Sequence, residues 1–355
     1  MGGRPTAGRV KLATEQRSTR VRRGRSRPRV VAVTGARTFL GRNLVALLEE
    51  DASVGKIVVL DIKNAPTAGP KTLFYELDLT QPGVDSRIAE IFHAEAVQVL
   101  AHLAFLASPT QATAFAHELE SVGTMHLLAA CHQHRGARMV VAGTTLAYGP
   151  HPANPNFLQE SSDLRGLPAA PFLDDKLDVE RQLKTFAAAA DGRVTLLRMA
   201  PILGPTVDNY VARWLSRTLV PTVMGHDPLV QFLHEVDAVA ALKLAVDIDC
   251  PGVFNVVGEG VLPISTVVKL AGRIAVPVPY GIFRRVSSLL WLAQLSEAPP
   301  AFAAALRYLF VADGRKALQV LGFRPAYTTR DAVLDFEGAL RLREARLLDH
   351  TVRIA

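Results

Sequence analysis

The sequence predicts an α/β protein with a doubly wound (Rossmann) parallel sheet and a smaller C-terminal domain. Strand-like apolar runs alternate with helical patterns through the first two hundred residues, and the first run ends at a glycine turn. Continuous apolar runs separated by helices are typical of a parallel sheet that helices cover on both faces. The expected strands are 30–33, 56–61, 72–77, 97–103, 137–142 and 194–198, and the expected helices are about 84–94, 110–134 and 173–188.

The pattern divides the chain into three parts. Residues 1–28 are expected to form a disordered basic tail, 29–200 a sheet domain that binds a dinucleotide, and 201–345 a substrate domain. In the third part, 282–310 contains two apolar helical segments. This segment could line a hydrophobic pocket, dock a second subunit or touch a membrane surface, and simple burial in the core is the expectation we prefer.

The positive charge of the chain is concentrated at its start. The net charge is +7, but residues 1–29 hold ten of the 40 Lys and Arg and one of the 33 acids, so the body carries about −2. A protein body with nearly balanced charge lacks the basic surface expected for specific nucleic-acid binding. The tail is expected to be a solvated extension or an early start of translation; a mitochondrial transit peptide and contact with RNA or an anionic surface are alternatives.

Cysteine use and hydropathy indicate a reduced compartment. Cys131 and Cys250 are isolated, without a CxxC or a His pattern that would suggest a metal site. No run reaches the ~18 apolar residues of a membrane span. We therefore expect a cytoplasmic protein without bound metal and without a transmembrane segment.

The segment VVAVTGARTFLGRNL, residues 30–44, has the layout of a strand, a glycine turn and a helix N-terminus. Such an N-terminus can hold a phosphate. Gly35 and Gly41 fit this role, but Thr38 stands where a further glycine would let a pyrophosphate approach the backbone. Its side chain would crowd the pyrophosphate or shift the turn, although its hydroxyl could donate one hydrogen bond. An ordinary turn in an empty site is the alternative.

Two acids at the ends of later strands support a dinucleotide site. Asp61 ends the second strand, where a carboxylate can accept hydrogen bonds from the adenosine ribose and would repel a 2′-phosphate. Asp78, followed by Leu79, closes the third strand, where an acid could meet the adenine amino group. The sequence therefore favours NAD over NADP.

Six segments, in order between residues 31 and 336, make the chain resemble the extended short-chain dehydrogenase/reductase family, which contains sugar-nucleotide epimerases and dehydratases. The segments are TGARTFLG (34–41), HLAF (102–105), AGTTLAYG (142–149), FLHEVD (232–237), GVFNVVG (252–258) and LGFRP (321–325).

The resemblance implies NAD as cofactor, a small-molecule substrate such as a nucleotide sugar or another hydroxylated compound, and a homodimer as one assembly. The residues that it places against the cofactor are Gly35, Thr38, Phe39, Leu40, Gly41, Asp61, Asp78, Leu79, Leu103, Ala104 and Lys176.

The same resemblance implies a Ser/Thr–Tyr–Lys catalytic set that is incomplete here. Thr144 matches the Ser/Thr and Lys176 the lysine, but Phe172 stands where the family has the tyrosine that exchanges a proton with the substrate. Glu120 stands where the family commonly has an asparagine. General acid–base catalysis typically contributes ~10²–10⁴-fold, so alcohol–ketone chemistry should be impaired unless another group substitutes.

Three nearby groups are candidates for that substitution. Asp175 lies three residues along the helix from Phe172, and Tyr148 and His151 lie on the preceding loop. We expect Tyr148 to be structural and Asp175 to be solvated.

The sequence leaves several functions open. The leading one is an NAD-dependent epimerase, dehydratase or other oxidoreductase acting on a nucleotide sugar or similar substrate. The alternatives are a non-catalytic NAD-binding regulatory or structural protein, a sterol- or lipid-type hydroxy dehydrogenase, and a scaffold whose tail engages an anionic polymer.

Overall fold

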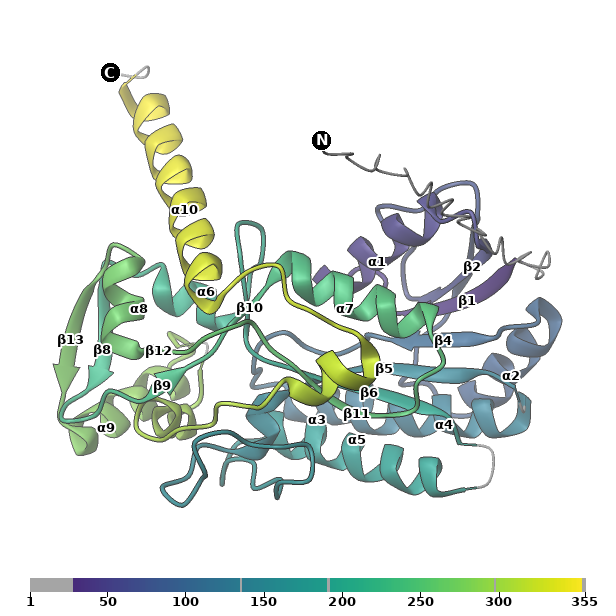
Figure 1. The fold of residues 1–355 in the computed structure, drawn as a ribbon, viewed down its shortest axis with the longest axis horizontal. Helices are drawn as coiled ribbons and strands as arrows, with labels where there is room; N and C mark the ends of the chain where they lie inside the picture. The colour runs from purple at the N-terminus through teal and green to yellow at the C-terminus, as the bar shows by residue number, and fades with distance from the viewer. Residues whose placement is uncertain (1–27, 135, 190–191, 297, 353–355) are drawn as a thin grey trace, which may run out of the picture.

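A seven-stranded parallel sheet forms the centre of the computed structural model, which describes residues 28–134, 136–189, 192–296 and 298–352. Its order is β11-β6-β5-β4-β1-β2-β3 (Figure 1). The chain therefore builds outward from β1 in one direction and, after a crossover, from β4 in the other, which confirms the predicted doubly wound class. The strands are β1 (Arg29–Thr34), β2 (Val54–Asp61), β3 (Thr72–Glu76), β4 (Val99–His102), β5 (Arg138–Thr144), β6 (Val194–Met199) and β11 (Gly252–Val256).

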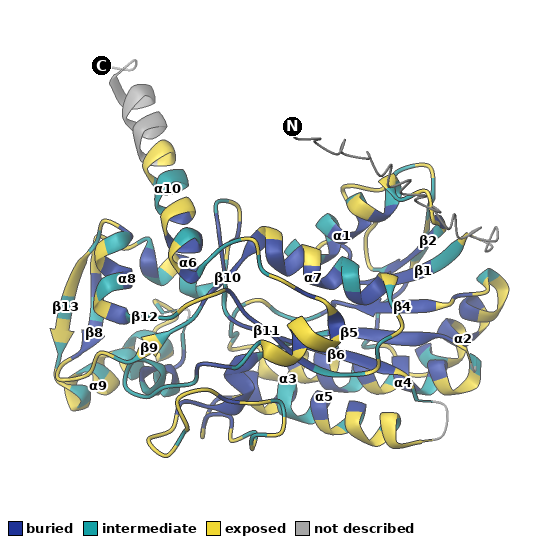
Figure 2. Ribbon diagram, viewed as in Figure 1, coloured by how far each residue is buried: buried dark blue, intermediate teal, exposed yellow. Residues whose placement is uncertain are grey.

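Helices cover both faces of this sheet. On one face lie α1 (Phe39–Glu50) and α7 (Glu235–Asp247), and on the other α2 (Val84–Glu95), α4 (Gly123–His134) and α5 (Pro171–Ala188) (Figure 1). Because successive side chains of a strand point to opposite faces, Val31 and Val33 enter one core and Ala32 the other. Apart from the edge strand β3, which has no buried residue, the strands are buried along most of their length (Figure 2).

The predicted helix at 110–134 is continuous but not uniform. It consists of α3 (Thr113–His117), one π turn (Glu118–Val122) and then α4. The π turn carries Glu120, which is buried. Single π turns often occur at functional sites, and this one places an acid in the site described below.

A second, smaller group of elements follows β6. Strands β8 (Leu219–Val223) and β13 (Ile274–Val278) pair in parallel. Short two-residue strands make two further pairs, β7 (Ile202–Leu203) with β10 (Leu233–His234) and β9 (Leu229–Val230) with β12 (Leu262–Pro263). The helical elements are α6 (Tyr210–Leu215), α8 (Ile264–Leu270), α9 (Tyr280–Leu292), the 3₁₀ segment η3 (Pro300–Leu306), the π turn η4 (Ala317–Leu321) and α10 (Thr329–Val352).

The two parts interleave along the chain. Although α7 and β11 come after residue 200, α7 packs on the sheet and β11 pairs with β6. The domain boundary between residues 200 and 201 stays a prediction. The central sheet and the helices that cover it contain residues from before and after that boundary.

The apolar segment 282–310 does not follow the expectation of simple core burial throughout. None of the residues of α9, all of which are described, is buried, and Leu289 and Leu292 are largely exposed. Phe302 in η3 is buried. Within the described residues no helix is long and apolar enough to cross a membrane. Except for Pro28, the tail predicted over 1–28 lies outside those residues.

Candidate functional site

The glycine turn after β1 is pressed against the neighbouring strand. Gly35 has a φ of 65°, and a Cβ at this position would lie 2.3 Å from the carbonyl oxygen of Leu103. A Cβ on Gly41 would lie 2.0 Å from the carbonyl oxygen of Gly35. Both positions therefore require glycine, the first for its backbone conformation and the second for the close packing of α1 on the turn.

Thr38 is the N-cap of α1. Its Oγ1 accepts a hydrogen bond from the Gly41 amide at 3.0 Å and donates one to the Gly35 carbonyl at 2.8 Å. The hydroxyl hydrogen of Thr38 is thus used inside the turn. In this arrangement the hydroxyl does not donate to a pyrophosphate, as the sequence had suggested that it could. The first backbone amides of a helix have no acceptor within the helix. In α1 these include the amides of Phe39 and Leu40, whose position suits them to donate to a phosphate.

Asp61 lies beside the same turn, at the end of β2. Its Oδ1 accepts from the Ile62 amide at 2.8 Å. Burial raises the pKa of its carboxyl, and hydrogen bonds from the Ala36 and Arg37 amides act in the opposite direction. The carboxylate is therefore held between the end of β2 and the glycine turn, where a ribose hydroxyl could reach it.

Asp78 is held in its own loop. Its Oδ1 accepts from the amide and the hydroxyl of Thr80 at 3.0 and 2.8 Å, and the Thr80 amide is the main cause of a lowered pKa. The neighbouring Leu79 is buried, and its carbonyl accepts from His126. Asp78 is thus a charged side chain at the end of β3, with its orientation set by local hydrogen bonds.

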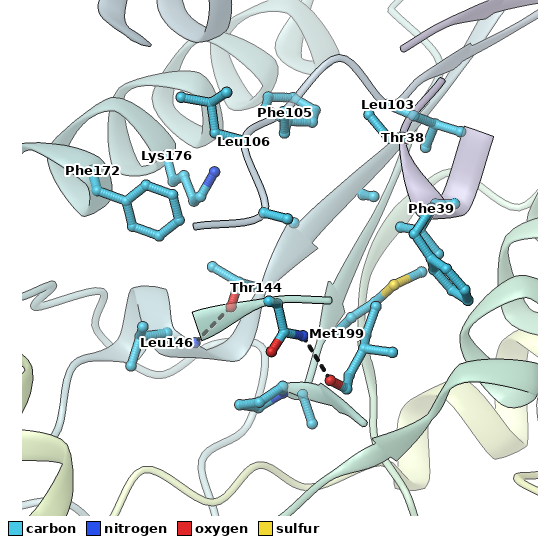
Figure 3. A pocket seen from close by; sticks show the side chains of 18 of the residues that line it. Thr38, Phe39, Leu103, Phe105, Leu106, Thr144, Leu146, Phe172, Lys176 and Met199 are labelled. Atoms are coloured by element: carbon cyan, nitrogen blue, oxygen red, sulfur yellow. Dashed lines mark hydrogen bonds between the residues drawn. The ribbon is translucent and has the colours of Figure 1, made fainter. Parts of the chain in front are cut away.

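A cavity of about 190 Å³ lies over the carboxyl ends of the central strands. Thr38 and Phe39 line one end of it, Phe172 and Lys176 line the other, and Thr144 lies between them (Figure 3). Six of the predicted site residues line this single cavity, namely Thr38, Phe39, Leu40, Leu103, Thr144 and Lys176. The other six, Gly35, Gly41, Asp61, Asp78, Leu79 and Ala104, are not part of its lining.

Lys176 is already paired with an acid. Its Nζ lies 2.9 and 3.1 Å from the two carboxylate oxygens of Glu120, whose side chain is only 1% exposed. Glu120 also accepts from the Leu106 amide at 2.7 Å. The ammonium group lies over two rings, 4.3 Å from the centre of Phe172 and 5.4 Å from that of Phe105 (Figure 3). The sequence singled out Glu120 only as a departure from the family pattern; the fold makes it the partner of the lysine.

Thr144 ends β5 and caps the following 3₁₀ turn, η2 (Thr145–Tyr148). Its Oγ1 accepts from the Leu146 amide at 3.2 Å (Figure 3). Since a hydroxyl that accepts one bond keeps its own hydrogen, Thr144 can still donate to a ligand in the cavity.

Among the described residues that line this cavity, none is one of the three candidates to replace the tyrosine, Asp175, Tyr148 and His151. Asp175 is buried, not solvated as expected, and its Oδ1 lies 2.7 Å from Nδ1 of His117. Tyr148 is fully buried and donates to Asn255 at 2.7 Å, as expected of a structural residue. His151 is exposed on its loop.

Tyr210 is a lining residue that the sequence did not indicate. It lies at the start of α6, lines the cavity, and packs edge-on against Phe302 with ring centres 5.2 Å apart. Burial raises the pKa of its phenol, so it stays protonated and is able to donate a hydrogen bond. No motif marks it, because its place in the site depends on how the second part of the chain folds back on the sheet.

The chain is similar to known proteins over most of its length. Residues 31–257 match the model of a family described as the NAD dependent epimerase/dehydratase family. An uncharacterized protein of Mycobacterium tuberculosis is 33% identical over 318 residues, which cover 87% of this chain and 83% of that protein. A 3-diazoavenalumate denitrifying reductase of a Streptomyces species is 27% identical over 238 residues, covering 66% and 77%.

Solved structures share the fold. The UDP-glucose 4-epimerase of Thermotoga maritima, solved with UDP-glucose, aligns with a TM-score of 0.67 at 19% identity and covers 88% of this chain and 99% of its own. A dTDP-glucose 4,6-dehydratase of Streptomyces venezuelae, solved with NAD, aligns with a TM-score of 0.69 at 18% identity, covering 89% and 98%. The resemblance drawn from the sequence motifs is confirmed at the level of family and fold.

Proposed function

Because the chain belongs to the NAD dependent epimerase/dehydratase family, we propose that it is an NAD-dependent oxidoreductase that transfers hydride without a phenol at position 172. One observation carries this proposal. Phe172 offers no proton, and Lys176, which would lower the pKa of a tyrosine there, is held by Glu120 instead. The phenylalanine at 172 and the glutamate at 120 are consistent with each other, because a lysine with no tyrosine beside it needs another partner for its charge.

The residues of the glycine turn fit the cofactor. The Phe39 and Leu40 amides at the N-terminus of α1 would hold the pyrophosphate, and Asp61 would accept from the adenosine ribose. Gly41 brings α1 close to the turn. NAD, when bound, supplies or accepts the hydride. Thr144 can orient a substrate group by donating a hydrogen bond, and most of the side chains that line the cavity are apolar.

A site of this composition suits a hydride acceptor that needs no proton from the protein. The reductive loss of nitrogen from an aryl diazonium ion is such a reaction: the carbon gains a hydride from NADH, the C–N bond breaks, and N₂ leaves with the bonding electron pair. NAD⁺ and the arene are the other products, and no proton is transferred. The Streptomyces relative, named a 3-diazoavenalumate denitrifying reductase, supports this chemistry for the present chain.

Two other functions each have an observation in their favour. The Glu120–Lys176 ion pair favours a non-catalytic protein that uses NAD as a structural or signalling ligand. The fold shared with the two nucleotide-sugar enzymes favours a nucleotide sugar as substrate. A homodimer and a cytoplasmic location stay proposals as well.

The test compares acceptors in the presence of NADH labelled with deuterium on one face of C4. The acceptors are 4-diazoniobenzoate, cinnamaldehyde and UDP-glucose. We expect deuterium in the benzoate from one face of NADH only, whereas the uncatalysed reaction, measured without protein, uses both faces. Phe172→Tyr should leave this rate unchanged.

The proposal is refuted if the native protein binds NAD but reduces none of the three acceptors, or if deuterium enters the benzoate from both faces of NADH, as it does without protein. Epimerisation of UDP-glucose or reduction of cinnamaldehyde by the native protein would instead show that another group transfers the proton. Stabilisation by NAD without reduction of any acceptor would favour the non-catalytic function.

A further inference from the structure

A second cavity, of about 330 Å³, adjoins the first on the side away from the glycine turn. Leu146, Pro201, Tyr210 and Val211 line both cavities. The second one lies among α6, β8, α8, α9 and η3, so the later part of the chain builds most of its wall. A substrate whose reactive end lies near Thr144 can therefore extend its remaining part into this space.

The wall of the second cavity is mainly aromatic and aliphatic. Its rings belong to Tyr210, Trp214, Phe232, Phe283, Phe302 and Phe310. Aromatic and aliphatic walls with few polar groups are typical of sites for apolar ligands.

The polar side chains in this wall are mostly occupied by the protein. The Trp214 indole donates to the Pro221 carbonyl at 3.3 Å. Gln231 donates to the Gly258 carbonyl and accepts from the Ala312 amide, both at 3.2 Å. Burying a diphosphate or a sugar against such a wall would leave its polar atoms without partners, at a cost of several kcal/mol. The wall therefore selects against a nucleotide sugar.

Two arginines mark the mouth of the cavity. Arg213 pairs with Asp208, whose Oδ1 lies 2.6 Å from Nε. Arg217 lines the same cavity, is exposed, and has no carboxylate paired with it among the described residues. An anionic group at this mouth would meet the planar donor set of a guanidinium.

We propose that this cavity binds the apolar body of an aromatic or aliphatic carboxylic acid, with the carboxylate at Arg217 and the reactive end in the first cavity. The inference names a substrate class and so rests on the proposed oxidoreductase function. Binding itself is measurable without turnover, however, so the two can fail separately.

The probes are dodecanoate below its micellar concentration, dodecan-1-ol and UDP-glucose. The chain has two tryptophans, and a Trp291→Phe background leaves Trp214 in the cavity wall as the single indole reporter. We expect dodecanoate to change Trp214 emission in a saturable way and UDP-glucose to have no effect. Dodecan-1-ol should bind about 2- to 5-fold more weakly than dodecanoate, the difference expected of an exposed ion pair.

Two variants separate the apolar and the charged contributions. Ser287→Phe, at a half-exposed position on α9 that lines the cavity, should weaken both ligands at least about tenfold because the ring occupies the space. Arg217→Gln should weaken dodecanoate to the level of dodecan-1-ol and leave dodecan-1-ol unchanged. Arg87→Gln, at an exposed arginine on α2, is the matched control and should change neither.

Thermal stabilisation by NAD shows that each variant is folded. The inference is overturned if dodecanoate binds equally well to the native protein and to folded Ser287→Phe, or if UDP-glucose binds more tightly than dodecanoate and Ser287→Phe weakens it. It is also overturned if Arg217→Gln and Arg87→Gln have the same effect. Dodecanoate binding without reduction of any acceptor would refute the proposed function and leave this inference standing.

Discussion

Replacing Glu120 by glutamine removes the charge that holds Lys176 while keeping the size of the side chain and the acceptor for the Leu106 amide. Removing one partner of a buried ion pair costs about 3–5 kcal/mol because the other charge stays behind. Here two features reduce the loss. Lys176 is 13% exposed toward the cavity, so water can reach it, and the rings of Phe172 and Phe105 still attract the ammonium group.

We therefore expect Glu120→Gln to lower the free energy of unfolding by about 2–3 kcal/mol. At about 2–4 °C per kcal/mol for a domain of 150–250 residues, the Tm should fall by about 4–12 °C. Urea and thermal denaturation measure the two quantities. An unchanged Tm would refute the reasoning, since it would mean that the ion pair contributes nothing to stability.

The same pair decides what a restored tyrosine can do. In Phe172→Tyr alone, Glu120 still holds Lys176, so we expect less than about a tenfold gain in the reduction of cinnamaldehyde. In the double variant Glu120→Gln/Phe172→Tyr the lysine is free to lower the pKa of the new phenol. The gain should then approach the ~10²–10⁴-fold of a positioned acid or base.

A double-mutant cycle on kcat/KM tests this coupling. If Phe172→Tyr alone gives the full gain, or if the two changes simply multiply, then Glu120 does not control Lys176 and the argument fails.

Three further predictions follow from single residues. Asp61→Ala should reduce the preference for NAD over NADP in thermal-shift titrations, because the carboxylate that repels a 2′-phosphate is gone; an unchanged ratio would contradict this. Thr38→Gly should tighten NAD binding by relieving the pyrophosphate contact, and should cost only a few tenths of a kcal/mol as a helix cap; weaker binding would show that the hydroxyl holds the turn in its binding shape. The Asp175 hydrogen bond raises the pKa of His117, so its stabilisation is full below the ordinary pKa of histidine and is lost as the pH rises through the raised value. At pH 5.5 the native protein should therefore be more stable than His117→Asn, by less than about 1 kcal/mol because His117 is half exposed. This difference in the free energy of unfolding should vanish by pH 8.5. A difference that grows with pH would contradict the prediction.

The features that the sequence determined by itself are those that depend on neighbours along the chain. The alternation of apolar runs and helices predicted the parallel sheet because the side-chain period of each element is local. The glycine turn after β1 was visible for the same reason, since its conformation is set within a few residues. Phe172 and Lys176 lie four residues apart on one helix, so their common face followed from the helical repeat.

Contacts between distant parts of the chain were decided by the tertiary structure alone. Glu120 precedes Lys176 by 56 positions, and nothing in its spacing predicts that a π turn brings the two charges together. The cap geometry of Thr38 likewise became clear only with the turn in three dimensions.

The apolar cavity shows the same limit most clearly. Its wall comes from segments between residues 146 and 310 that fold back on the end of the sheet. A periodic pattern states which face of an element is apolar, but not which distant face it will meet. The sequence therefore determined the family and its cofactor turn, whereas the fold decided which charge neutralises Lys176 and which apolar wall adjoins the first cavity.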